Sequence, residues 1–117
     1  MEIIDSHVHV WRADAILYPV NRSLGLPEGF DAPAELLLKE MGAAGVDKAV
    51  LVQPSNYEFD NRYLSDCLTA YPGRFAGVMR IDPVDSSAPR RLAMWVEQYG
   101  IRGLRLSLKE KTLFKTQ

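Results

Sequence analysis

Apolar runs and amphipathic segments alternate along the chain. The stretch AVLV, within residues 46–53, is apolar without alternation, as in a strand that is covered on both faces. One side of a helix is indicated by the spacing of Leu92, Trp95, Val96 and Tyr99. On such patterns we predict strands over 2–8, 46–53, 75–81 and 101–108, the first of them short and buried. We predict helices over 33–44, 58–71 and 87–99, the last of which Ser87 can cap.

The order of these segments predicts the fold class. Strands that alternate with helices and short returns form right-handed βαβ units in a parallel sheet. We therefore expect an α/β protein with about four parallel strands and three helices. Both a doubly wound sheet and a (β/α)8 barrel begin in this way, and four strands alone do not separate them. A complete barrel typically needs about 250 residues, more than twice the 117 present.

Composition argues against several classes of protein. Of the 117 residues, 47% are hydrophobic and 25% are charged, which is typical of a folded globular domain. The net charge of -1 and the lack of a basic stripe argue against a nucleic-acid partner. No apolar run approaches the roughly 20 residues that span a bilayer, so no membrane partner is expected. The lone Cys67 favours a reducing, cytoplasmic location, and its place on a helix face predicts a core residue.

The first predicted strand ends with the only two histidines of the chain. Because side chains alternate along a strand, Asp5, His7 and His9 are expected to share one face. Two imidazoles at this spacing can bind one zinc or similar ion, and Asp5 lies where it can support a ligand. A chance His-x-His is the alternative. Since barrel enzymes place their chemistry at the carboxyl ends of the strands, we predict a metal pair.

Three further residues are candidate substrate contacts. Gln53 ends the second predicted strand, although a polar turn that caps the next helix explains it as well. Arg105 can bind a substrate carboxylate if its strand face is the lumen, and it is a surface or ion-paired arginine if it faces the helices. Trp11 lies with Tyr18 in the long connection 10–32, which covers a pocket or packs on the barrel rim. We expect this connection at the end of the sheet that carries the histidines.

Several stretches of the chain resemble a known family. The segment "IIDSHVHVW" resembles the opening of the amidohydrolase-related family, often called amidohydrolase 2. The run "VDKAVLVQPSNYEFDNRYLSDCLTAYPGRFAGVMRIDP", followed by "IRGLRLSL", is similar to the branch that contains sugar lactonases and dicarboxylate-lactone hydrolases. The resemblance covers residues 1–108 and implies the N-terminal half of a (β/α)8 TIM barrel. Residues 109–117 are a polar tail that departs from the family's pattern.

The resemblance also implies an activity. The family suggests a metal-dependent hydrolase that acts on a lactone or another cyclic ester or amide. His7 and His9 match the family's first-strand metal pair, for which we expect zinc, with manganese as the alternative. The family takes further metal-site histidines from middle strands and a catalytic aspartate from its last strand. This sequence has no third histidine and its predicted strands stop at the fourth, so we expect a truncated chain.

A four-stranded half barrel is expected to have two open edges. The lumen-facing candidates are Ile3, Leu51 and Met79, or their neighbours if the register is shifted by one. About half of their packing partners would belong to strands that are not present. We therefore expect self-association through the open barrel edges, and no turnover by the 117-residue chain alone.

Two other functions are compatible with the same residues. A decarboxylase of the same superfamily would use the same metal pair, so the histidines do not distinguish it from a hydrolase. A non-catalytic remnant that acts as a binding module is the alternative from another class. Release of CO2, opening of a ring, or no turnover at all would separate the three.

Overall fold

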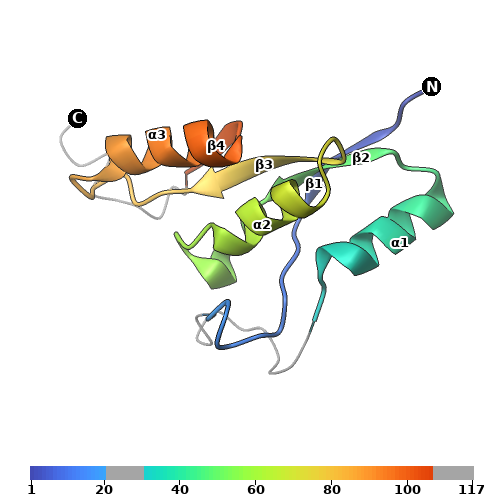
Figure 1. Ribbon diagram of the computed structural model, residues 1–117, viewed down its shortest axis with the longest axis horizontal. Coiled ribbons are helices and arrows are strands. Elements are labelled where there is room, and N and C mark those ends of the chain that lie inside the picture. Colours follow the sequence, from blue (N-terminus) through green and yellow to red (C-terminus); the bar gives the residue numbers. More distant parts are fainter. Residues whose placement is uncertain (21–30, 107–117) are drawn as a thin grey trace.

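Four strands and three α-helices alternate along the chain in the computed structural model, which describes residues 1–20 and 31–106 (Figure 1). The elements are β1 (Ile4–Val8), α1 (Ala34–Ala44), β2 (Lys48–Val52), the 3₁₀ helix η2 (Ser55–Tyr57), α2 (Arg62–Ala70), β3 (Phe75–Arg80), α3 (Ala88–Tyr99) and β4 (Gly103–Arg105). This order confirms the predicted α/β class. The predicted polar tail, 109–117, lies outside the described residues.

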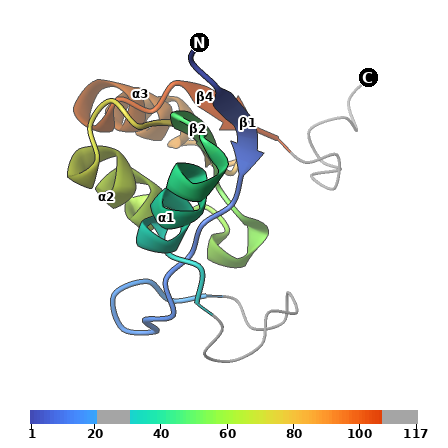
Figure 2. The same cartoon turned by 90° about the vertical axis from the view of Figure 1, so that its right-hand side faces the viewer.

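The four strands form one parallel sheet in the order β1-β2-β3-β4. Each new strand is therefore added on the same side of the previous one. A doubly wound sheet would reverse this order at its switch point, whereas a barrel wall continues in one direction. Figure 2 shows the three α-helices together on one side of the sheet, and β1 on the side away from them. The fold is thus part of a barrel wall, with helices outside.

The helix-covered face of the sheet contains the core. Leu51 and Met79 are almost fully buried there, in a cluster with residues of α2 that includes the predicted core residue Cys67. A side chain added at Gly77 would meet the Leu68 side chain at 3.0 Å, so β3 lies directly against α2. The placement of Leu51 and Met79 on the lumen side is therefore wrong, and their neighbours occupy that face instead. Of the two alternatives for the lumen-facing residues, the one shifted by one residue therefore holds for β2 and β3.

The ends of the helices follow the predicted signals with two exceptions. Gly45 and Gly100 end α1 and α3 in the left-handed conformation, at φ 74° and 69°. The helix predicted over 58–71 begins only at α2, because Glu58, at φ 52°, interrupts the right-handed turn that η2 starts. Ser87 precedes α3, but its hydroxyl donates to the Asp85 carboxylate at 2.8 Å and makes no cap.

The outer strands are far more exposed than the inner ones. Ile4 of β1 is 52% exposed and Leu104 of β4 is 41% exposed, whereas Leu51 of β2 is fully buried. The prediction of a buried first strand is therefore wrong, because among the described residues β1 has a hydrogen-bonded neighbour on one side only. The predicted lumen residue Ile3 precedes β1 and is 47% exposed. Within the described ranges no helix is long and apolar enough to cross a membrane.

Candidate functional site

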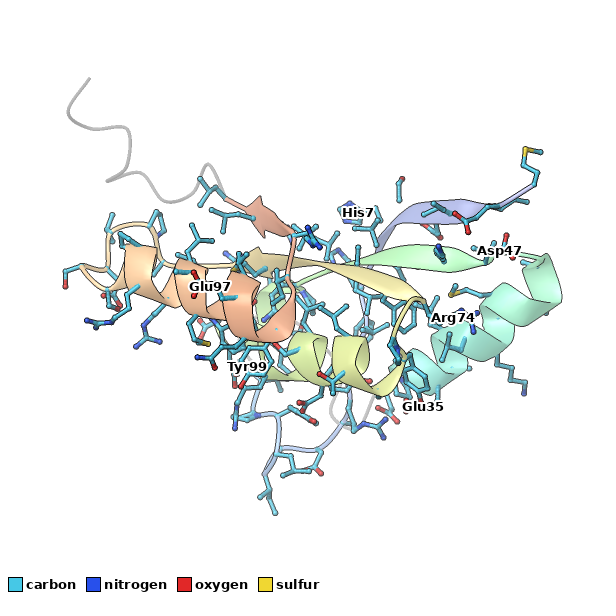
Figure 3. The ribbon with its side chains drawn as sticks, turned by 45° about the horizontal axis from the view of Figure 1, so that its top comes forward. His7, Glu35, Asp47, Arg74, Glu97 and Tyr99 are labelled. Carbon is cyan, nitrogen blue, oxygen red and sulfur yellow. The ribbon has the colours of Figure 1, made fainter. Side chains whose placement is uncertain are left out.

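The two histidines meet at the carboxyl end of β1. The Nε2 atoms of His7 and His9 lie 3.3 Å apart, and their rings are nearly perpendicular. Val8, between them, packs against the core on the helix side of the sheet. His7 and His9 therefore flank it on the opposite, open face, and Figure 3 shows His7 on the other side of the sheet from Glu35 and Tyr99.

A backbone carbonyl of the neighbouring strand orients His9. The Nδ1 atom of His9 lies 2.7 Å from the carbonyl oxygen of Val52, at the end of β2. Because a carbonyl oxygen only accepts hydrogen bonds, Nδ1 must carry the proton. The neutral ring then has its lone pair on Nε2, which is the atom that faces His7. This second contact is of the kind that fixes the tautomer of metal-binding histidines.

The Asp5 side chain contacts the backbone at the first of the two histidines. Its carboxylate accepts a hydrogen bond from the backbone N–H of His7 at 3.1 Å. The pairing of β1 with β2 is irregular between Asp5 and Val8, so the strict alternation that would place Asp5 on the face of His7 and His9 does not hold over this stretch. The described contact of Asp5 is therefore with the His7 backbone, and its supporting role for a ligand stays a prediction.

The spacing of the two imidazoles fits a tetrahedral metal ion. Zinc binds histidine nitrogens at about 2.0–2.1 Å, and two tetrahedral ligands at that length lie about 3.3–3.4 Å apart. The observed separation of 3.3 Å has this value. Over residues 1–20 and 31–106, no group of three or more His, Cys, Asp or Glu side chains could hold a metal ion. The described part of the chain thus offers two neighbouring imidazoles, fewer than the three or four ligands of a usual zinc shell.

Arg105 lies on the same open face of the sheet, at the carboxyl end of β4. Val78 follows Gly77, which faces α2, so Val78 and its in-register partner Gly103 lie on the open face. Arg105 is two residues further along and shares that face. Its Nη1 atom donates to the backbone carbonyl of Gln53 at 3.1 Å. Of the two placements considered for Arg105, the structure has the one on the lumen side, while contact with a substrate stays a prediction.

The side chain of Gln53 is enclosed rather than open to the site. It is fully buried, and its amide nitrogen donates to the backbone carbonyls of Asp60 at 2.7 Å and Glu58 at 3.4 Å. These bonds support the loop after β2, as a polar turn residue would. Its amide oxygen is buried with no hydrogen-bond partner in the described part of the chain. A role in substrate binding for Gln53 stays a prediction that these contacts do not favour.

A second buried amide, Asn61, was missed by the sequence analysis. Its side-chain oxygen accepts from the backbone N–H of Arg80 at 3.0 Å, and its nitrogen donates to the Arg80 carbonyl at 2.8 Å. Asn61 therefore joins the loop after β2 to the end of β3. An asparagine before a helix reads as an ordinary cap, and only the fold brings it beside Arg80.

Residues before α1 are held by the helices rather than by the histidines. Trp11 forms an antiparallel bridge with Ala32 and packs against the core. Tyr18 donates to the Asp66 carboxylate of α2, and its ring lies 4.9 Å from that of Tyr63. Burial and the Asp66 contact raise the pKa of Tyr18 to about 12, so it remains a neutral donor. Of the two alternatives given for this connection, the described contacts of Tyr18 are those of packing against the helices; residues 21–30 of the same connection lie outside the described residues.

Comparison with solved structures finds proteins of the same fold. A protein from Pseudomonas putida, assigned as a 2-pyrone-4,6-dicarboxylic acid hydrolase, is 34% identical, with a TM-score of 0.67 over 90% of this chain. One from Acinetobacter baumannii, with the same assignment and with citric acid bound, is 23% identical, with a TM-score of 0.74 over 91%. A protein from Agrobacterium tumefaciens is 22% identical, with a TM-score of 0.64 over 88%.

These proteins are much longer than the chain. It covers 38% of the Acinetobacter protein and 36% of each of the other two. Comparison with curated protein sequences finds no significant match. A family model described as amidohydrolase matches residues 4–112, nearly the whole chain and past the expected boundary at 108. The chain therefore belongs to the amidohydrolase family, whose members are hydrolase-type enzymes.

Proposed function

We propose that this chain carries the first metal-binding strand of a metal-dependent hydrolase that opens a lactone or another cyclic ester or amide. The observation that carries the proposal is the pair of imidazole nitrogens 3.3 Å apart on the open face at the carboxyl end of β1. That separation matches the edge of a tetrahedral zinc shell. The contact of His9 with the Val52 carbonyl supports it further, because it selects the tautomer of the neutral ring whose lone pair is on the facing nitrogen.

The charge of the same edge favours an anionic substrate. Arg105 and its in-register neighbour Arg80 end two adjacent strands on the open face. A guanidinium can bind a carboxylate through two parallel hydrogen bonds. The Pseudomonas protein, at 34% identity, is assigned to a cyclic dicarboxylic acid, which is consistent with this charge. We therefore propose a lactone that carries carboxylates, with Arg105 as its anchor and Trp11 at the margin of the site.

Each described residue would have a limited task in this reaction. A divalent ion, zinc or alternatively manganese, would supply Lewis-acid activation of the ester carbonyl. His7 and His9 would hold that ion, and the Val52 carbonyl would keep the His9 ring oriented. Arg105 would hold the substrate through its carboxylate. The general base and the remaining ligands would come from outside the described residues, since these offer no third ligand beside the pair.

Calorimetric titration with zinc tests the metal pair. We expect weak but measurable binding by the 117-residue chain, and a loss of at least about tenfold in affinity for His7→Ala/His9→Ala. The control is Cys67→Ala, which removes the only cysteine, a buried residue of α2, and should leave the affinity unchanged. Equal affinity of the wild-type chain and the histidine variant would refute the proposed role of the pair.

The reaction itself is tested by product analysis. A full-length barrel that contains this segment should open the ring of a dicarboxylate lactone without releasing CO2. Arg105→Lys should weaken binding of that substrate, because lysine loses the bidentate geometry. Release of CO2 would instead identify the decarboxylase of the same superfamily, which would use the same histidines.

A further inference from the structure

We propose that Tyr57 of η2 is a positioning residue for the metal pair. Its hydroxyl holds the backbone of Arg12, three residues after His9, and through that backbone it keeps the His9 ring on the Val52 carbonyl. The inference rests on the metal pair of the proposed function, and it assigns a task to a residue outside that pair. It follows from the two hydrogen bonds of the hydroxyl, the place of His9 in the chain, and the support behind Tyr57.

The Tyr57 hydroxyl makes two hydrogen bonds with a single residue of the first connection. It accepts from the backbone N–H of Arg12 at 2.8 Å and donates to the backbone carbonyl of the same residue at 3.1 Å. Only a neutral hydroxyl can do both. Tyr57 is buried in the core, and this burial raises its pKa to about 12, so the hydroxyl keeps its proton. Both backbone polar groups of Arg12 are therefore held by one side chain.

His9 lies where the backbone needs such support. The strand β1 ends one residue before it, so the position of His9 depends also on the residues that follow. Val10 is buried in the core cluster, and Arg12 is bound to Tyr57. The ring of His9 is held by the Val52 carbonyl at 2.7 Å. The end of β2 and the loop after it thus contact both the imidazole and the backbone that carries it.

The loop that carries Tyr57 is itself anchored to the end of β2. The buried amide of Gln53 donates to the backbone carbonyls of Asp60 at 2.7 Å and Glu58 at 3.4 Å. Glu58, directly after Tyr57, has a φ of 52°, which residues other than glycine rarely adopt. Such a conformation persists only where the surrounding contacts impose it. The contacts of this loop therefore fix the turn that follows Tyr57.

Tyr63 provides a matched control for the loss of a hydroxyl. It is 4% exposed, against 3% for Tyr57, and its hydroxyl also accepts from a backbone N–H of the first connection. That N–H belongs to Ala34, at the start of α1 and at the far end of the connection from His9. Removal of either hydroxyl should therefore weaken the fold, but only that of Tyr57 should affect the metal pair.

The test is the ring tautomer of His9, measured by nitrogen NMR without metal in mildly alkaline solution. In the wild-type chain we expect the proton on Nδ1, as the Val52 contact requires. Tyr57→Phe keeps the ring and removes only the hydroxyl, so the His9 ring should change to a mixture of both tautomers. Zinc affinity by calorimetry should fall by about tenfold, the lower end of the range for contacts that orient metal ligands. Tyr63→Phe should change neither quantity.

Glu58→Gly provides a second background in which to test the hydroxyl. Glycine adopts a positive φ without steric cost, so this change should stabilise the loop. If Tyr57→Phe alone is poorly folded, the comparison of Glu58→Gly with Tyr57→Phe/Glu58→Gly isolates the hydroxyl. Circular dichroism should show that both proteins are folded. The tautomer and affinity changes expected for Tyr57→Phe should appear again in this pair.

The outcomes that overturn the inference differ from the one that overturns the proposed function. An unchanged His9 tautomer or zinc affinity in folded Tyr57→Phe would refute the role of Tyr57 and leave the metal pair standing. Equal changes in Tyr57→Phe and Tyr63→Phe would also refute it, because a general loss of stability would then explain both. Equal zinc affinity of the wild-type chain and His7→Ala/His9→Ala would instead refute the proposed function, an outcome seen in a different variant.

Discussion

The inner strands of the sheet are richer in apolar residues than the outer ones, and they also have very different surroundings. In β2, Ala49 and Leu51 are at most 1% exposed, whereas Ile4 of β1 is 52% exposed. The inner strands have a neighbour on each side and helices over one face, while each outer strand has one neighbour in the described residues. Because Ile4 and Leu51 are both large apolar side chains, their difference in burial follows from what lies beside each strand.

The same contrast holds for polar groups. At the ends of the inner strands, the buried amides of Gln53 and Asn61 are used to satisfy backbone groups of the same chain. At the outer strand β1, the Nε2 atoms of His7 and His9 face each other on the open side of the sheet. The chain thus uses buried polar residues for structure where the sheet is covered, and its two histidines lie together where the sheet is open.

The largest expected effect comes from truncating one aliphatic side chain in each region. Leu51→Ala should lower the free energy of unfolding by about 2–5 kcal/mol, because it removes a fully buried side chain and leaves a cavity. Ile4→Ala, the matched change on β1, should cost less than about 1 kcal/mol, since half of that side chain is already exposed. Urea unfolding with a chelator present measures both. Similar losses would show that the edge strand is covered in solution.

A smaller effect is expected from the buried amides. Asn61→Ala should cost about 1–3 kcal/mol, because it leaves the N–H and carbonyl of Arg80 without their side-chain partner. Asn56→Ala is the control, since Asn56 is similarly buried but its amide nitrogen has no partner among the described residues. Its cost should be clearly lower by urea unfolding. Equal costs would mean that the Asn61 bonds add nothing beyond packing.

Most of the fold could be predicted from the sequence because its signals are local. The apolar run of β2 and the glycines that end α1 and α3 depend on neighbouring residues, and the predicted elements agree with the observed ones. The histidine spacing is local as well, and the pair does meet. Element type and the proximity of the two histidines therefore follow from short-range patterns, while metal binding by them stays a prediction.

The errors concern features that depend on distant residues. The face of Leu51 and Met79 depends on register, which a continuous apolar run does not specify. The contact of Tyr18 with Asp66 joins residues 48 positions apart, and so could not be predicted from spacing. The exposure of β1 depends on which strands are beside it. Sequence patterns therefore predict the elements better than the contacts between them.

The smallest effect should come from the exposed network that ties α1 to α2. The Tyr71 hydroxyl donates to Glu35 at 2.6 Å, and Arg12 pairs with the other oxygen of that carboxylate. The Tyr71 hydrogen bond, helped by Arg12 and opposed by partial burial, lowers the pKa of Glu35 below its usual 4.5. Because the folded state lowers this pKa, its contribution to stability is present above the usual value and is lost as the pH falls through the lowered one.

Glu35→Gln should therefore destabilise the chain at pH 7 and not at pH 3. The loss should be below about 1 kcal/mol, since the Glu35 side chain is 49% exposed and solvent screens the pair. Thermal unfolding of both proteins at the two pH values measures the difference, which should vanish in acid. The control is Glu40→Gln, an exposed position of the same helix, which should leave the stability at pH 7 nearly unchanged. A difference that persists at pH 3 would mean that Glu35 acts through packing and not through its charge.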